Sequence, residues 1–222
     1  MSSGSGSELG VKAVLTVNGT AACLAVDYCR GRLRKPDNGI YDALNKGIAR
    51  AHGDVVGFLH ADDIYADADV LARIAAAFAD PAVEAVYGDL VYVRKEDTGK
   101  VVRYWRSRPF SRRQLAWGWM PPHPTFYVRR ELYQRFGAFD TTYRIAADYD
   151  CMLRLLTRLQ GRVFYLPEVL VRMRLGGAGN RSPANIIRKS YEDYLALRRN
   201  NLGGAGALAW KNLSKIRQFF VR

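Results

Sequence analysis

Hydrophobic residues recur along the chain with two spacings, one typical of helices and one typical of buried strands. From residue 40 they fall three or four positions apart, which predicts an amphipathic helix. The apolar face of that helix would comprise Ile40, Leu44, Ile48 and Ala51. A continuous apolar run from Val55 to Leu59 follows and is typical of a strand buried on both faces. The run ends at His60-Ala61-Asp62-Asp63, so polar side chains are expected at the carboxyl end of the strand.

The chain beyond this unit continues to alternate between helical and strand-like patterns. Helices are predicted around residues 70–78, 131–136, 148–159 and 183–199, and strands around 83–93, 101–105, 125–128, 163–166 and 169–173. The first of these strands is expected to be interrupted near Gly88-Asp89. Residues 106–126 are rich in proline, tryptophan and arginine and are expected to form a long ordered loop. The alternation predicts a single α/β domain over residues 11–180.

Upstream of residue 37 the pattern is poorer. Residues 1–10 are rich in glycine and serine and are expected to be flexible. Val11 to Val17 is one plausible strand, and a short apolar patch from Leu24 to Tyr28 follows it. Asn18-Gly19 is a turn signal, and there is no glycine-rich loop that could cradle a phosphate.

Composition narrows the choice of partners. The 222 residues carry a formal net charge of +13, which favours anionic partners such as nucleotide phosphates or acidic lipid headgroups. Nucleic-acid binding would rest on charge alone, because no recognition-helix, zinc-finger or aromatic RNA-binding motif is present. The three cysteines match no zinc spacing or disulfide framework. With no membrane-spanning run or signal peptide, we expect a cytoplasmic protein, with the inner face of the membrane as a second location.

Four stretches of the sequence together resemble a known family. They are DNGIYDALNKGI, GDVVGFLHADDIYAD, HPTFYVRRELYQRFGAFD and YRIAADYDCMLRL, and they cover roughly residues 37–175. In their order and spacing they resemble the family 2 glycosyltransferases, in particular the bacterial enzymes of polysaccharide and O-antigen assembly. The resemblance implies the GT-A fold, a mixed sheet flanked by helices.

The resemblance also implies a chemistry: a nucleotide-sugar donor, a divalent cation and transfer by a single inverting displacement. His60-Ala61-Asp62 occupies the place of the family's metal-binding Asp-x-Asp motif, and Asp63 adjoins it. Histidine in the first position departs from the usual form and leaves the metal to Asp62 or Asp63. These carboxylates are the hard oxygen ligands that Mn²⁺ or Mg²⁺ takes. A strand that ends in two aspartates before a helix can also be plain turn chemistry.

Other residues receive roles from the same resemblance. Asp148 stands where the family has its general base, although Ala147 replaces the glutamate that usually precedes it, and Asp150 is a reserve candidate. His123 and Trp119 fall in the acceptor-side loop, where loop packing is the alternative reading. Nucleotide-sugar contacts are expected from a set on the first helix and strand: Asp37, Asn45, Lys46, His60 and Asp62. Asn45 and Lys46 could equally be solvated helix residues.

The N-terminal part departs from the family. Only about 25 usable residues precede Pro36, and the family's nucleobase-binding motif, similar to VDGGSTDGT, is absent. We therefore expect an incomplete N-terminal Rossmann-like half, as in a truncated, frame-shifted, deleted or designed chain. The remaining sheet would then have an unpaired or irregularly covered edge.

The C-terminal part, residues 181–222, is expected to be a basic helical extension. From residue 170 to the end, eleven lysines and arginines stand against Glu192 and Asp193. With Trp210, Phe219 and Phe220 this composition fits peripheral attachment to an anionic membrane, or else a solvated helix face. Two functions therefore stay open. The first is sugar transfer to a glycan or lipid-linked acceptor; the second is a non-catalytic remnant acting as a basic membrane-surface module.

Overall fold

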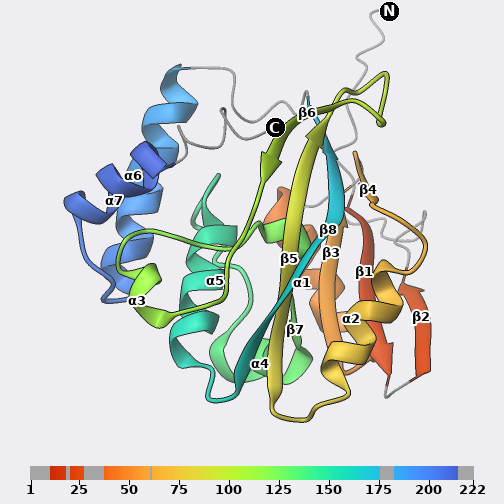
Figure 1. Cartoon of the computed structure of the whole chain (residues 1–222). Helices are drawn as coiled ribbons and strands as arrows, with labels where there is room; N and C mark the ends of the chain where they lie inside the picture. The colour runs from red at the N-terminus through yellow and green to blue at the C-terminus, as the bar shows by residue number, and fades with distance from the viewer. Residues whose placement is uncertain (1–10, 19–20, 28–37, 61, 176–182, 215–222) are drawn as a thin grey trace, which may run out of the picture.

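The computed structural model describes residues 11–18, 21–27, 38–60, 62–175 and 183–214. Figure 1 shows a twisted sheet with helices on both faces. The described strands are β1 (Val11–Asn18), β2 (Ala21–Asp27), β3 (Val55–His60), β4 (Asp63–Tyr65), β5 (Val83–Val93), β6 (Val101–Trp105), β7 (Tyr127–Arg129) and β8 (Arg162–Arg174). The described helices are α1 (Ile40–Arg50), α2 (Val70–Phe78), α3 (Arg112–Leu115), the 3₁₀ turn η1 (His123–Thr125), α4 (Arg130–Phe136), α5 (Ala147–Arg158), α6 (Pro183–Arg199) and α7 (Ala205–Ser214).

The sheet is mixed. Its strand order is β2-β1-β3-β7-β5-β8-β4, and β6 pairs with β5 off this path. β5 and β8 run parallel, while the other recorded pairs are antiparallel. This mixed sheet with helices on both faces confirms the predicted fold class.

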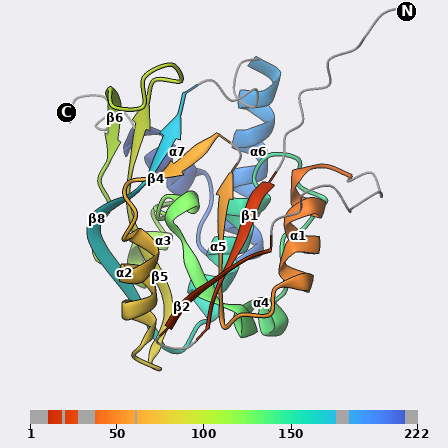
Figure 2. The same ribbon diagram turned by 90° about the vertical axis from the view of Figure 1, so that its right-hand side faces the viewer.

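Two hydrophobic cores cover the two faces of the sheet. The larger core joins α1, α4, α5 and α6 to one face, and the smaller core joins α2 to the other. Consecutive residues of β3 divide between them, because Val55 belongs to the smaller core and Val56 to the larger. Figure 2 shows α1 and α2 on opposite sides of the sheet. A strand buried on both faces is what the apolar run Val55 to Leu59 predicts.

β3 also shows why a glycine stands in the middle of this apolar run. A Cβ on Gly57 would lie 2.1 Å from a ring carbon of Tyr127 on the neighbouring strand β7. The aromatic ring therefore occupies the space where any other side chain would begin. This close approach fixes how β7, and the η1 turn that precedes it, lie against β3.

The N-terminal segment forms a hairpin. β1 lies antiparallel to β3, from Val11 opposite His60 to Val17 opposite Val55, and β2 lies antiparallel to β1. Residues 21–27 form a strand, where the sequence suggested only an apolar patch. Both recorded pairings of this hairpin are antiparallel, and an incomplete Rossmann-like half stays a prediction.

Two predicted strand boundaries differ from the structure. The predicted strands at 163–166 and 169–173 are one strand, β8, because parallel pairing with β5 carries it through Pro167. β5 is continuous over 11 residues, and the predicted interruption appears as two register shifts beside Asp89. The carboxylate of Asp89 is buried there and accepts hydrogen bonds from two tyrosine hydroxyls and one backbone N–H.

The C-terminal helices pack on the same body. Ala196 and Leu197 of α6 are fully buried in the larger core, against α5. A buried ion pair joins α7 to α6, with Lys211 Nζ at 2.8 Å from Asp193 Oδ2. Within the described part of the chain, no helix has the length and apolar character needed to span a bilayer.

Candidate active site

Three of the predicted site residues, His60, His123 and Asp148, lie together where β3 ends. His60 is the last residue of β3, and His123, the first residue of the η1 turn, lies beside it. Nε2 of His60 lies 2.8 Å from Nε2 of His123, which is a hydrogen bond between the two imidazole rings. β3 and the η1 turn therefore meet through two side chains that are 63 residues apart in sequence.

Asp148 lies on the other side of His123. Its Oδ2 is 3.8 Å from Nδ1 of His123, and about a quarter of its side chain is exposed. The hydroxyl of Tyr41, from α1, lies 3.5 Å from the other carboxylate oxygen of Asp148. Asp148 stands in the first turn of α5, where the helix dipole favours a negative charge. A partly exposed carboxylate in this position can accept a proton from a bound hydroxyl group.

Both histidines are neutral at physiological pH. Burial, then the neighbouring His123, lowers the pKa of His60 to about 3, against a weaker opposite effect of Asp148. Burial lowers the pKa of His123 too, and the charge of Asp148 offsets part of this effect. With His60 as donor to Nε2 of His123, the N–H at Nδ1 of His123 faces the Asp148 carboxylate. This tautomer satisfies both contacts of His123.

The two consecutive aspartates after β3 differ in burial. Asp62 lies in the turn and is exposed, whereas Asp63 begins β4 and is 3% exposed. β4 pairs with β8, which holds the Asp63 backbone opposite Met173. The Oδ2 atom of Asp63 is buried without a hydrogen-bond partner among the described residues. Burial, then the charge of Asp62, raises the pKa of Asp63 to about 7, while Arg174 acts in the opposite direction.

These two carboxylates fit a divalent cation. A buried carboxylate oxygen without a partner is costly unless something positive binds it, and a metal ion would also relieve the repulsion from Asp62. In the described ranges, no group of three or more His, Cys, Asp or Glu side chains could enclose a metal ion. The protein would therefore supply one or two carboxylates and leave the remaining positions to phosphate oxygens and water, as Mg²⁺ sites commonly do.

The model of the family described as "Glycosyl transferase family 2" matches residues 27–142, which is more than half of the chain. The chain belongs to glycosyltransferase family 2. The matched region contains α1, β3 and the two aspartates, as well as the η1 turn with His123.

Curated relatives agree with this family. A PGL/p-HBAD biosynthesis glycosyltransferase of Mycobacterium tuberculosis is 33% identical over 122 residues, which are 54% of this chain and 45% of that protein. An uncharacterized glycosyltransferase of the same organism is 36% identical over 126 residues, with the same shares. The chain thus spans about half the length of the curated relatives it matches.

Solved glycosyltransferase structures share the fold. The mannosyltransferase PcManGT of Pyrobaculum calidifontis, solved with GDP-Man and Mn²⁺, superposes with a TM-score of 0.54 at 22% identity. The match covers 83% of this chain and 52% of that protein. Staphylococcus aureus TarS, residues 1–349, gives a TM-score of 0.52 at 17% identity and covers 81% of this chain and 52% of the other. These likenesses confirm the GT-A-like architecture.

Two further residues expected at the site of this family 2 protein have structural partners. The side-chain amide of Asn45 is paired with Phe139, since its Nδ2 donates to the carbonyl at 2.8 Å and its Oδ1 accepts from the N–H at 2.9 Å. Lys46 forms an ion pair with Asp42 at 2.7 Å, one turn back on α1. Asp37 lies outside the described residues.

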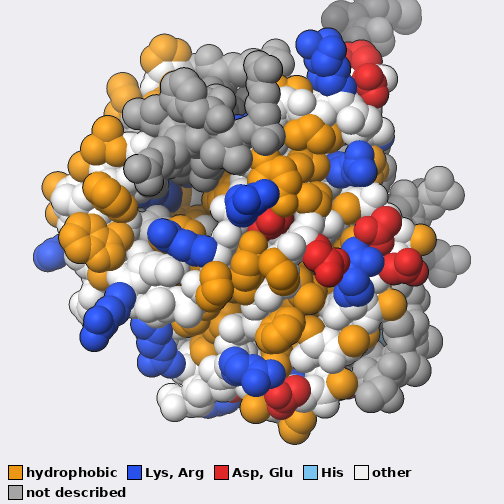
Figure 3. Space-filling view, in the orientation of Figure 1, with side chains coloured by type: hydrophobic (Ala, Val, Ile, Leu, Met, Phe, Trp, Pro, Cys, Tyr) orange, Lys and Arg blue, Asp and Glu red, His pale blue; other side chains and the backbone are white. Residues whose placement is uncertain are grey.

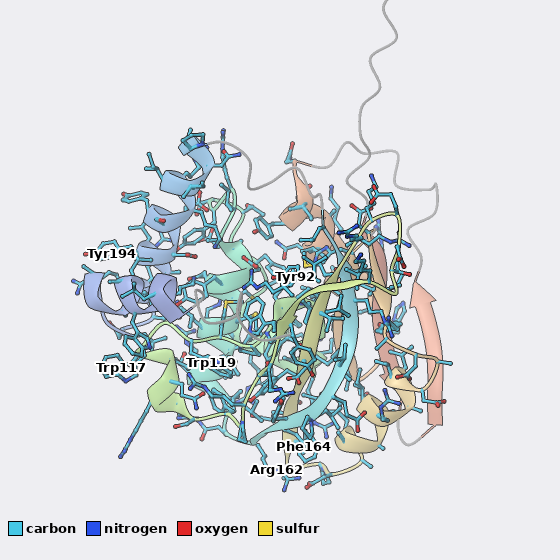
Figure 4. The ribbon with its side chains drawn as sticks, turned by 45° about the horizontal axis from the view of Figure 1, so that its top comes forward. Tyr92, Trp117, Trp119, Arg162, Phe164 and Tyr194 are labelled. Atoms are coloured by element: carbon cyan, nitrogen blue, oxygen red, sulfur yellow. The ribbon has the colours of Figure 1, made fainter. Side chains whose placement is uncertain are left out.

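Asp150 and Trp119 also have packing partners. Asp150, the reserve candidate for the base, is buried and accepts from Arg154 at 2.6 Å and Asn200 at 3.1 Å. Trp119, labelled in Figure 4, lies edge-on to Tyr87 with 6.0 Å between ring centroids and packs against the larger core. Asp150 is therefore held inside the protein, while Trp119 keeps a partly exposed ring near the η1 turn.

Sequence analysis missed two residues that hold the segment before Asp148. Tyr41 donates a hydrogen bond to the carbonyl of Ile145 at 2.5 Å, and Glu192 accepts from backbone N–H groups in the same segment. Tyr41 lies within the first of the four stretches that resemble the family, and this is the signal that marks it in the sequence. Glu192 has no local signal, because its role depends on how α6 docks.

Proposed function

We propose that this chain carries the catalytic centre of an inverting, metal-dependent glycosyltransferase. It would move a sugar from a nucleotide-sugar donor to a hydroxyl group of a glycan or lipid-linked acceptor. The catalytic base would be Asp148, the metal ligands Asp62 and Asp63, and His123 would face the acceptor. The chain covers about half of its curated relatives, so the proposal concerns the activity of a protein that contains this centre.

One observation carries the proposal: the acceptor-side and donor-side residues converge at the end of β3. His123 contacts His60 at 2.8 Å and faces Asp148 at 3.8 Å, and the two aspartates follow His60 directly along the chain. A base, an acceptor-side loop and a pair of metal-binding carboxylates are the parts that this transfer needs. Their convergence supports a reaction centre over separate structural roles for each residue.

The reaction follows from the position of Asp148. Its carboxylate takes the proton of the acceptor hydroxyl as that oxygen bonds to the anomeric carbon of the donor sugar. The bond from that carbon to the diphosphate oxygen breaks, and the nucleoside diphosphate leaves with the electron pair. A single displacement of this kind inverts the anomeric configuration. His123, neutral and hydrogen-bonded to His60, holds its position without adding a positive charge beside the base.

A divalent cation at Asp62 and Asp63 would neutralise charge on the leaving diphosphate. The buried Oδ2 of Asp63 supports this assignment, because it has no hydrogen-bond partner among the described residues. The complex of PcManGT with GDP-Man and Mn²⁺ makes Mn²⁺ and GDP-sugars natural first choices for an assay. At 22% identity that complex does not identify the donor of this chain, so the assay must include UDP-sugars.

Calorimetry with GDP and UDP, with and without Mn²⁺, tests donor binding first. The proposal predicts Mn²⁺-dependent affinity for one of them and its loss in the variant Asp62→Ala. Absence of any metal-dependent affinity would favour the alternative reading, a remnant without catalysis. Turnover of GDP- and UDP-sugars by the parent chain and by Asp148→Asn then tests the base. Turnover that Asp148→Asn leaves unchanged would reject Asp148 as the base.

The C-terminal helices support a second, compatible proposal, peripheral contact with an anionic membrane surface. Large apolar side chains on α6 and α7 are more than half exposed, namely Ile186, Ile187, Tyr191, Trp210 and Leu213. On the side of the molecule that carries these helices, at the left of Figure 3, apolar and basic side chains lie together. Cosedimentation with anionic vesicles, weakened by salt and by Ile187→Ser, is the expected result. Equal binding to neutral vesicles would contradict it.

A further inference from the structure

The segment before α5 is held by a carboxylate from a distant helix. Glu192, on α6, is 7% exposed, and its two oxygens accept hydrogen bonds from three consecutive backbone N–H groups. Oε1 accepts from Arg144 at 3.2 Å, while Oε2 accepts from Ile145 at 2.8 Å and from Ala146 at 2.9 Å. Ala146 is the residue just before α5 and makes no side-chain cap of its own. Glu192 therefore takes the place of an N-cap side chain, from another element.

The same three residues are fixed from the opposite side by α1. The hydroxyl of Tyr41 donates to the carbonyl oxygen of Ile145 at 2.5 Å. The N–H of Ile145 points to Glu192, and its carbonyl points to Tyr41, so both polar groups of one peptide residue are anchored. Tyr41 also lies 3.5 Å from Asp148 itself. The backbone of residues 144–146, which leads into Asp148, is thus held between Tyr41 of α1 and Glu192 of α6. We call this arrangement the clamp.

The chemistry of the clamp favours a carboxylate over a neutral group. Three N–H dipoles and the positive end of the α5 dipole converge on Glu192, and hydrogen bonds to a charged acceptor are stronger than neutral ones. An amide in its place keeps one oxygen, enough for the two shorter bonds, but turns an NH₂ group toward the third N–H. Glutamine should therefore preserve part of the clamp and alanine none of it.

We propose that Glu192 is a positioning residue for Asp148. It acts through the backbone of residues 144–146, contacts no substrate, and keeps the Asp148 carboxylate beside His123 while α6 is docked. The proposal rests on the proposed function for its meaning in catalysis, but its geometry can be tested without any substrate.

The test uses the ring signal of His123 in NMR spectra at pH 8. The chain has three histidines, so comparison with His123→Gln assigns that signal. The variant Asp148→Asn removes the charge 3.8 Å from the ring and should displace the signal. Glu192→Ala should displace the His123 signal in the same direction, by at least half of the displacement that Asp148→Asn causes. Glu192→Gln should displace it by less than Glu192→Ala does. Tyr191→Ala, a control at the exposed neighbouring position of α6, should leave it unmoved.

Three results would overturn the proposal: a folded Glu192→Ala with the parent signal, an equal displacement in Tyr191→Ala, or no displacement in Asp148→Asn. If Glu192→Ala does not fold, Glu192→Gln decides by the same signal, and an unmoved signal rejects the proposal.

Turnover separates this inference from the proposed function. Once a donor is known, Glu192→Ala should lower kcat about 100-fold at unchanged donor KM, because small misplacements of a catalytic group have effects of that size. Added to Asp148→Asn, it should cause no further loss, since both changes disable the same group. An additive loss would place Glu192 in another role. If Asp148→Asn alone is fully active, the proposed role of Asp148 as the base is wrong. The structural role of Glu192 is then still decided by the NMR signal of His123.

Discussion

The variant Asp63→Asn gives the sharpest physical test of the aspartate pair at the end of β3. Asp63 is 3% exposed, and its Oδ2 has no hydrogen-bond partner among the described residues. Burial and the charge of Asp62 raise its pKa from 3.8 to about 7. Asparagine has nearly the shape of the protonated acid and cannot ionise, so this substitution removes the buried charge and little else.

The sign of the effect follows from the raised pKa. The folded chain holds the proton more tightly than the unfolded chain, so the contribution of Asp63 to stability is complete below the ordinary pKa of 3.8. It decreases as the pH rises and is lost once the pH passes the folded-state pKa of about 7. Between pH 5 and pH 8 the raised pKa of Asp63 therefore lowers the unfolding free energy of the parent chain by about 3 kcal/mol. In the asparagine variant, residue 63 does not contribute to the pH dependence of the unfolding free energy.

The assay is urea denaturation of the parent and of Asp63→Asn at pH 5 and pH 8, in the presence of a chelator. As the pH rises from 5 to 8, the unfolding free energy of the variant should increase relative to that of the parent by about 3 kcal/mol. Comparing the difference at two pH values cancels any fixed cost of the asparagine amide. At pH 8, Mn²⁺ should then stabilise the parent and leave the variant unchanged.

Two results would refute this reasoning. A stability difference that is the same at both pH values would mean that Asp63 does not ionise as a buried group. Equal stabilisation of both proteins by Mn²⁺ would mean that Asp63 is not part of a metal site. The first result concerns the electrostatics of burial and the second the assignment of the ligand, so they can be told apart.

The remaining predictions concern the scaffold and are measured by urea denaturation, with a far-UV CD spectrum as the check on folding. Gly57→Ala should cost at least about 2 kcal/mol, because its Cβ would overlap the Tyr127 ring; an unchanged midpoint would contradict the close approach of β7. Asp89→Ala should cost about 3 kcal/mol by leaving three donors without their acceptor, and a loss below 1 kcal/mol would refute that network. Lys211→Met should cost about 3 kcal/mol, because it breaks the buried ion pair with Asp193; a variant as stable as the parent would refute that contribution of the pair.

Local sequence patterns predict much of this fold because they coincide with its two cores. The spacing of Leu44 and Ile48 predicts α1, and both side chains are buried in the larger core. The run from Val55 predicts β3, whose residues alternate between the cores. The helix predicted over residues 148–159 is likewise confirmed as α5, with Leu155 and Leu156 fully buried.

Elements whose existence depends on pairing were harder to predict. β4 spans three residues and exists because β8 pairs with it, and β8 passes through Pro167 because β5 runs alongside. The segment 21–27 has no strong alternation and becomes a strand only through the hairpin with β1. In each case the partner strand supplies what the local pattern lacks.

The candidate site divides in the same way. The residue types at its centre could be chosen from the sequence, since Asp62, His123 and Asp148 stand in motifs that resemble the family. Their contacts could not, because the His60–His123 bond and the Glu192 clamp join residues that are far apart in the chain. The burial of Asp63 was equally invisible, because it results from the pairing of β4 with β8.

The proposed role of Asp148 as the base of a sugar transfer can be tested by one comparison of rates. Donor consumption should be measured in Mn²⁺ for the parent, for Asp148→Asn and for Asp150→Asn, a matched carboxylate on the same helix that is tied to Arg154. If Asp148 is the base, Asp148→Asn should lose at least about 100-fold in kcat, as expected for removal of a general base, while folded Asp150→Asn should stay near the parent rate. A parent rate that survives in Asp148→Asn, or falls only in Asp150→Asn, would contradict it.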